Sequence, residues 1–189
     1  MATITISRQL GSLGTEVGQR LGECLGYRVV WREIINQAAR QAGAHEMALA
    51  TIDDLGLLRL RPTFAARRAY HNALETIVLG FADEGGVVII GRAGQAILGA
   101  RDDVLHVRVI APLESRVRRV AREQGIPVQA ARLQVEASDR SRRDYLRRDY
   151  HVNWDDPELY DLILNSSRLS VDAIVEIACW AVEQLGQPV

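Results

Sequence analysis

The chain has 189 residues, is 48% hydrophobic and carries a formal net charge of −1. This length suits one domain with one substantial core, and the near-neutral charge offers no general basic surface for a nucleic-acid backbone, so we expect no nucleic-acid partner. No apolar run approaches the about 20 residues needed to cross a bilayer, and the first residues alternate like a strand rather than like an export signal. We therefore expect a cytoplasmic protein with no membrane partner.

All 23 basic residues are arginine, which excludes any mechanism that depends on lysine. Arginine-for-lysine drift in a GC-rich genome is the simplest explanation. Cys24 and Cys179 lie far apart in the sequence, without the spacing of a metal or redox pair, so we expect each to be a small core residue. The four histidines share no ligand spacing either, so the sequence predicts no metal site formed by protein side chains.

The first part of the chain predicts alternating strands and helices. In chain order we expect a strand over 2–7, a glycine-rich loop over 8–14, a helix stopped by Gly26, a short buried strand over 27–31 and a helix that begins near Ile34. The pattern weakens over 43–63, where we expect a helical insertion rather than sheet.

The rest of the chain continues this alternation. We expect a helix over 64–83, strands over 87–90 and 104–110, a helix over 113–123, an arginine-rich helical segment over 127–150, a strand over 160–165 and a helix over 171–185. The strand Val87–Ile90 is wholly apolar, as in a parallel sheet covered on both faces. The prediction is a single α/β domain over 1–189 with a doubly wound parallel sheet, whose ligand crevice lies at the carboxyl ends of the strands.

The glycine-rich loop is the strongest functional feature. A glycine turn between a strand and a helix directs unpaired amides at one point, which is typical of a phosphate site. The full signature is Gly-x-x-x-x-Gly-Lys-Ser/Thr, and alignment on Gly14 puts Gln9, Thr15 and Glu16 at its other anchor positions. A tight turn without a ligand is the alternative. The candidate ATP-phosphate residues are Gly11, Ser12, Leu13, Gly14, Thr15 and Glu16, with Arg8 as the nearest cation that could replace the lysine.

Two further arginine features follow. Arg92 comes directly after the buried strand, where its guanidinium could clamp a monophosphate in bidentate fashion. Asp139 and Arg142 share one face of the arginine-rich helix, and Arg143 lies one turn from Asp139. This cluster could be a lid that closes over phosphates, or a solvated helix with ion pairs.

Several short runs, in this order and spacing, resemble the cytidylate kinase-like family. They are Ile4–Gly14, Gly91–Gly94, Ala111–Arg116, Trp154–Pro157, Tyr160–Leu162 and Asn165–Leu169. The resemblance implies a five-stranded P-loop NTPase-like core with a helical lid at 127–150, ATP with Mg²⁺ as donor and a nucleoside monophosphate such as CMP as acceptor. It also implies that Arg92 binds the acceptor phosphate and that Asp139 and Arg142 form the lid pair, near the pentose and the phosphates. We expect catalytic charge from Arg8, Arg142 and Arg143.

The chain also departs from that family. Ala93 stands where the classical enzymes have a base-reading aspartate, and Trp31 stands where relatives tend to have an acidic residue. The chain has no clear protein ligand for Mg²⁺. Three hypotheses stay open: an active nucleotide kinase, a degenerate nucleotide-binding module with little turnover, and a scaffold without nucleotide. Aromatic residues near the lid could stack on a base, although packing is the more economical use, and a homodimer is among the assemblies that the sequence permits.

Overall fold

The computed structural model describes residues 1–41, 43, 63–99 and 101–185. The helical insertion expected over 43–63 therefore lies almost entirely outside the described residues. The strands are β1 (Thr3–Arg8), β2 (Arg28–Val30), β3 (Val87–Ile90), β4 (Val104–Ile110) and β5 (Leu162–Asn165). The helices are α1 (Gly14–Leu25), α2 (Arg32–Gln41), α4 (Phe64–Glu84), α5 (Gly94–Leu98), α6 (Leu113–Gln124), α7 (Val128–Tyr150), the 3₁₀ helix η1 (Pro157–Leu159) and α8 (Val171–Gln184).

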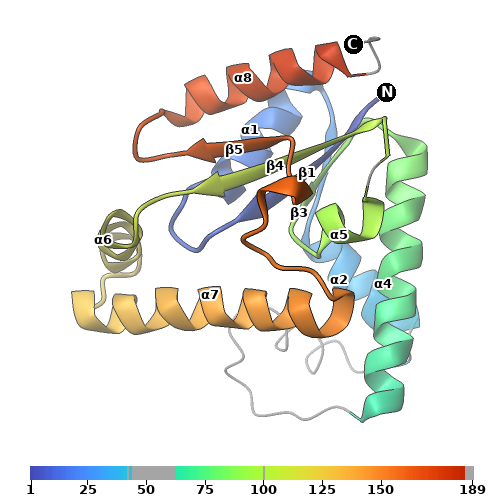
Figure 1. Cartoon of the computed structure of the whole chain (residues 1–189), viewed down its shortest axis with the longest axis horizontal. Helices are drawn as coiled ribbons and strands as arrows, with labels where there is room; N and C mark the ends of the chain where they lie inside the picture. Colours follow the sequence, from blue (N-terminus) through green and yellow to red (C-terminus); the bar gives the residue numbers. More distant parts are fainter. Residues whose placement is uncertain (42, 44–62, 100, 186–189) are drawn as a thin grey trace.

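The five strands form one parallel sheet in the order β2-β3-β1-β4-β5 (Figure 1). β1 is central, with Ile4 opposite Val88 of β3 and Leu105 of β4. The chain leaves β1 for the β2 side of the sheet and later crosses to the β4 side. A strand order of this kind opens a crevice where the connections diverge, at the carboxyl end of β1. The predicted doubly wound α/β sheet is confirmed.

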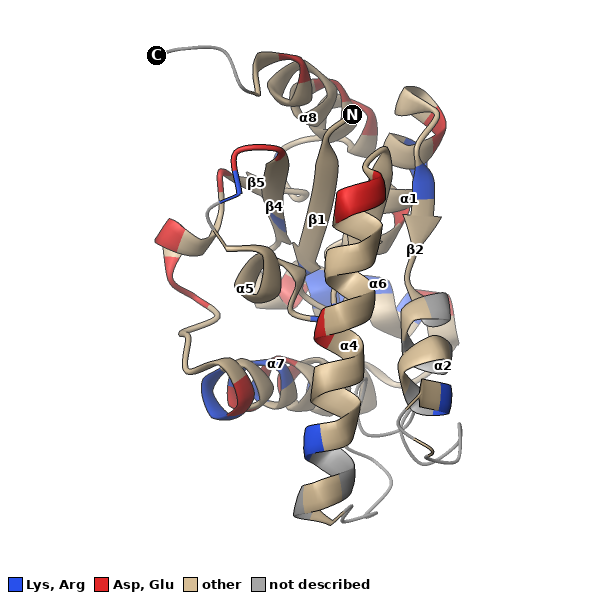
Figure 2. Cartoon of the chain, turned by 90° about the vertical axis from the view of Figure 1, so that its right-hand side faces the viewer, with Lys and Arg blue, Asp and Glu red and all other residues tan. Residues whose placement is uncertain are grey.

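Alternate residues of β3 explain the two layers of helices. Val88 and Ile90 pack with α1 and α8, whereas Val87 and Ile89 pack with α2 and α4. Figure 2 shows α4 across the second of these faces. Because both faces are covered, the strand can be wholly apolar.

Helix α7 runs across the side of the molecule where the strands end (Figure 1). Its Ala131 and Val135 pack on α6, and its Leu146 packs with Ala93 and Trp154. The predicted helix over 127–150 is confirmed within one residue. α5 and η1 were not predicted. None of the described helices combines the length and the apolar character that a bilayer crossing needs.

The prediction for the two cysteines is wrong. Cys24 is exposed and Cys179 is half-buried, so neither is a core residue. They also lie together, with 3.1 Å between their Sγ atoms, because α1 and α8 pack side by side on the same face of the sheet.

Candidate functional site

The loop between β1 and α1 is built as an anion-binding turn. Gly11 and Leu13 adopt left-handed backbone conformations, with φ of 77° and 64°. The first amide that closes a helical hydrogen bond is that of Val17, which donates to Leu13 O at 3.0 Å. Among the described residues, the amides of Gly14 and the two residues after it have no hydrogen-bond acceptor. These amides and the positive end of the α1 dipole face the space beyond the helix.

Arginines of α6 hold the loop from behind. Arg116 Nη1 donates to Leu10 O at 3.4 Å, and Arg119 Nη1 donates to Gly11 O at 3.2 Å. A Cβ atom on Gly11 would lie 2.7 Å from Arg116 O, so only glycine fits against α6. Because these carbonyls are bound on the α6 side, the loop presents amides rather than carbonyl oxygens to the opposite side.

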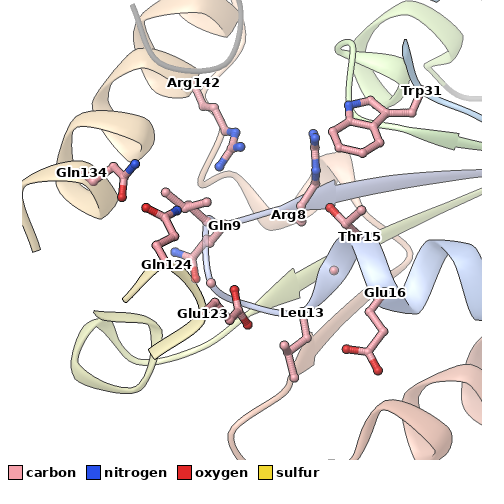
Figure 3. Close-up of a pocket in the computed structure, with 13 residues that line it drawn as sticks. Arg8, Gln9, Leu13, Thr15, Glu16, Trp31, Glu123, Gln124, Gln134 and Arg142 are labelled. Carbon is pink, nitrogen blue, oxygen red and sulfur yellow. The ribbon is translucent and has the colours of Figure 1, made fainter. Parts of the chain in front are cut away.

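A cavity of about 410 Å³ lies on that opposite side. Figure 3 shows Arg8 and Arg142 directed into it from different elements, β1 and α7, with Trp31 beside Arg8. The Arg8 guanidinium carbon is 5.9 Å from the centre of the Trp31 ring. The lining residues are Arg8, Gln9, Leu10, Gly11, Leu13, Gly14, Thr15, Glu16, Trp31, Glu123, Gln124, Gln134 and Arg142.

Of the predicted phosphate-loop residues, Ser12 is the one that does not line this cavity. Its side chain is fully buried, and its amide and hydroxyl both donate to Gln9 O, at 3.2 and 2.8 Å. Ser12 therefore closes the turn of the loop.

A second, smaller cavity of about 40 Å³ shares Arg8 and Arg142 with the first. Arg92 lies in its wall and is only 6% exposed. The pKa of Arg92 is lowered to about 10, chiefly by burial; Tyr145 opposes this change, and the neighbouring Arg142 charge contributes to it. The complete lining is Ser7, Arg8, Gly91, Arg92, Ala93, Gln95, Arg142, Tyr145, Leu146 and Trp154. The structure thus brings three of the predicted site arginines to one place.

Two predicted lid residues line neither cavity. Asp139, 6% exposed, forms an ion pair with Arg116, with 2.9 Å between Nη2 and Oδ2. Arg143 Nε donates to Asp155 Oδ2 at 2.7 Å. The acceptor-binding role of Asp139 and the catalytic role of Arg143 stay predictions, because both side chains are engaged with other parts of the protein.

Residues 3–168 match the cytidylate kinase-like family. The chain belongs to this family. A cytidylate kinase from Methanopyrus kandleri is 30% identical over 192 residues, which cover 96% of this chain and 93% of that protein. A uronate isomerase from Corynebacterium glutamicum is 35% identical over 100 residues, but this chain spans only 19% of that protein.

Solved structures show the same fold. A structure of an uncharacterized protein from Eubacterium ventriosum superposes with a TM-score of 0.77 at 16% identity, covering 97% of this chain and 99% of that one. The shikimate kinase from Acinetobacter baumannii, solved with shikimate, gives a TM-score of 0.56 at 15% identity over 100% and 96% of the chains. The fold is that of P-loop kinases, and family and fold together support a nucleotide kinase.

The segment after α7 joins the smaller cavity of this cytidylate kinase-like protein to the sheet. Trp154 is 2% exposed, and its Nε1 donates to Ser7 Oγ at 2.9 Å. Arg108, buried in β4, places its guanidinium carbon 4.5 Å from the centre of the Trp154 ring. Trp154 therefore packs inside the protein rather than stacking on a base, which is the use that the sequence analysis favoured for the aromatic residues near the lid.

Asp155 joins the sheet to α7. It accepts from Arg108 at 2.5 Å and from Arg143 at 2.7 Å. Although partial burial opposes the change, these hydrogen bonds hold the pKa of Asp155 below its ordinary value. Sequence reasoning did not predict the positioning roles of Arg108, Arg116 and Arg119. The usable signal was the presence of arginines on β4 and on the helix that follows it, where buried arginines need acceptors.

Proposed function

We propose that this protein is a cytidylate kinase-like phosphotransferase, which moves the γ-phosphate of ATP to a nucleoside monophosphate such as CMP. The observation that carries the proposal is that Arg8 and Arg142 line both cavities. ATP phosphates would lie on the free amides at the start of α1, and the acceptor phosphate would lie on Arg92. The transferring group would then pass between them, beside two guanidinium groups.

In phosphoryl transfer the protein contributes mainly by positioning the substrates and by placing charge around the transferring group, rather than by covalent chemistry. In place of the missing lysine, Arg8 and Arg142 supply two positive charges from two sides of the larger cavity. Each guanidinium is planar and can donate two parallel hydrogen bonds to phosphate oxygens. We propose that Arg142 is the lid residue that reaches the phosphates, while Asp139 and Arg143 fix α7 through their ion pairs.

The donors around the larger cavity fit Mg²⁺. In the described part of the chain no three metal-ligand side chains gather, but Mg²⁺ at kinase sites needs only one or two carboxylates, with substrate phosphates and water completing its shell. Glu16, Glu123 and Thr15 are among the residues that line the cavity, so a carboxylate of Glu16 or Glu123 would hold the ion. When bound, it would neutralise charge on the phosphate oxygens.

A nucleotide-binding module with little turnover is the second candidate. It is favoured by the lysine-free loop and by Glu16 at the position of the magnesium-binding hydroxyl. A cytoplasmic location, a homodimer and the absence of a nucleic-acid partner also stay predictions.

One experiment separates the candidates. Thermal unfolding with ATP and with each nucleoside monophosphate measures binding, and ADP release with and without CMP measures transfer. A kinase predicts ADP release that CMP stimulates and that Arg8→Met lowers by about 10²–10³-fold, whereas the matched exposed-arginine variant Arg168→Met keeps wild-type rates. Stabilisation by ATP without ADP release would favour the binding module, and no stabilisation by any nucleotide would refute both.

A further inference from the structure

Two cysteines that are distant in the sequence meet where α1 packs on α8. Cys24 lies in the last turn of α1 and Cys179 lies in α8, and the chain has no other cysteine. Cys179 donates its S–H to Cys24 Sγ, with 3.1 Å between the two sulfur atoms. A disulfide bond is about 2.05 Å long, so an approach of about 1 Å would join them. The two thiols are therefore placed to be linked without rearrangement of the sheet.

Contacts between the two helices hold the sulfur atoms within reach. Leu21 of α1 is fully buried in the same apolar cluster as Ile174 and Ala178 of α8. At the rim of this cluster Arg20 of α1 pairs with Asp172 of α8, with 2.6 Å between Nη1 and Oδ1. Because apolar packing and an ion pair both join α1 to α8, the helices keep the separation at which the thiols touch.

The two thiols differ in exposure and in protonation. Cys24 is exposed, so a dissolved oxidant reaches its sulfur directly. Cys179 is half-buried, and its pKa is raised to about 12, chiefly by burial, with the hydrogen bond to Cys24 and the charge of Glu183 acting in the same direction. Since the thiolate is the reactive form of cysteine, the protonated Cys179 is the slower of the two. Cys24 is therefore the sulfur that reacts first with an oxidant.

We propose that Cys24 and Cys179 are a peroxide-reactive thiol pair, in which Cys24 is oxidised and Cys179 completes a reversible disulfide. First, the Cys24 sulfur attacks hydrogen peroxide: an S–O bond forms, the O–O bond breaks, and the displaced hydroxide takes the thiol proton and leaves as water. The Cys179 sulfur then attacks the sulfenic acid: an S–S bond forms, the S–O bond breaks, and the hydroxide leaves with the Cys179 proton as water. Two thiols thus lose two electrons and two protons, and one peroxide is reduced to two waters. No step needs a nucleotide.

The neighbouring thiol decides the fate of the oxidised sulfur. A sulfenic acid without such a neighbour is open to further oxidation to sulfinic acid, which thiol reductants do not reverse. Cys179 lies in contact with Cys24 and forms the disulfide instead, and thiol reductants restore that bond. Disulfides in a reducing compartment are transient. The pair therefore protects Cys24, and it fastens the last turn of α1 to α8 only while peroxide is present.

Peptide mapping after treatment with hydrogen peroxide and dimedone tests the bond and the order of the steps. Dimedone traps a sulfenic acid, and trypsin cuts after arginine, so the disulfide would link the peptide 21–28 to the peptide that begins at residue 169. We expect this linked peptide from the wild type, without dimedone, and we expect dithiothreitol to restore both thiols. Cys179→Ser should carry dimedone at Cys24, whereas Cys24→Ser should react at least about tenfold more slowly at Cys179.

Thermal unfolding of the reduced proteins shows whether the two matched serine variants are folded. A wild type that gives sulfinic acid, no reaction, or a disulfide between two molecules would overturn the proposal. Equal rates of oxidation in Cys24→Ser and Cys179→Ser would overturn the order of the steps. Should a variant fail to fold, the wild type still decides, because the linked peptide from a monomer and its loss in dithiothreitol need no substitution.

Discussion

Arg92→Met should make the protein more stable while removing acceptor binding. The Arg92 charge is buried, and its pKa lies well below the ordinary value of arginine, at about 10, chiefly because of that burial. A lowering of this size corresponds to about 3 kcal/mol of unfavourable charge in the folded state. Methionine keeps much of the apolar stem but carries no charge, so we expect the free energy of unfolding to rise by about 1–3 kcal/mol.

The pH dependence follows from the same pKa. The folded-state pKa is lowered, so Arg92 is charged in both folded and unfolded chains below about pH 10, and the cost of burial is present in full there. The gain from Arg92→Met should therefore be constant between about pH 6 and 9. Urea unfolding at several pH values measures it, with the exposed Arg168→Met as control. A loss of stability in Arg92→Met, at unchanged denaturant slope, would show that the fold compensates the charge and would refute this reasoning.

Gly11→Ala should lower the free energy of unfolding by about 2 kcal/mol and abolish stabilisation by ATP, because the new methyl would meet α6 at a φ of 77°; urea unfolding with and without ATP checks both. Asp155→Asn should lower the free energy of unfolding by about 1–2 kcal/mol, because it leaves Arg108 buried without its ion pair. Because the pKa of Asp155 is lowered in the fold, the wild type should lose this contribution as pH falls below about 4, and the variant should not. A peroxide should oxidise Cys24 and Cys179 to an intramolecular disulfide that closes 155 residues, stabilising the fold by up to about 5 kcal/mol; a mass loss of about 2 Da, absent in Cys24→Ser, reports the bond.

The sheet could be predicted because its signals are local, whereas much of the site could not because its contacts are distant. The composition of the apolar run Val87–Ile90 is enough to predict a buried strand. α5 has only five residues, Gly94–Leu98, and is too short to show a helical period. Helical spacing placed Asp139 beside Arg142, but it could not show that Arg116 of the preceding helix covers Asp139. The prediction for the two cysteines was wrong for a similar reason, because only the packing of α1 and α8 on the same face of the sheet brings them together.

Arginine side chains lie on both sides of the loop between β1 and α1. Arg116 and Arg119 bind loop carbonyls on one side, while Arg8 and Arg142 line the cavity on the other. A lysine in the usual loop position would rise from the start of the helix and reach the phosphates from one direction as a point charge. Arg8 instead rises from the end of β1 and lines both cavities, so in the proposed kinase one guanidinium would reach the donor and the acceptor phosphates together. The same geometry makes its position depend on Gly91, where a Cβ atom would collide with the Arg8 guanidinium. The ends of β1 and β3 are therefore coupled by packing, because the glycine after β3 leaves the space that the Arg8 guanidinium occupies.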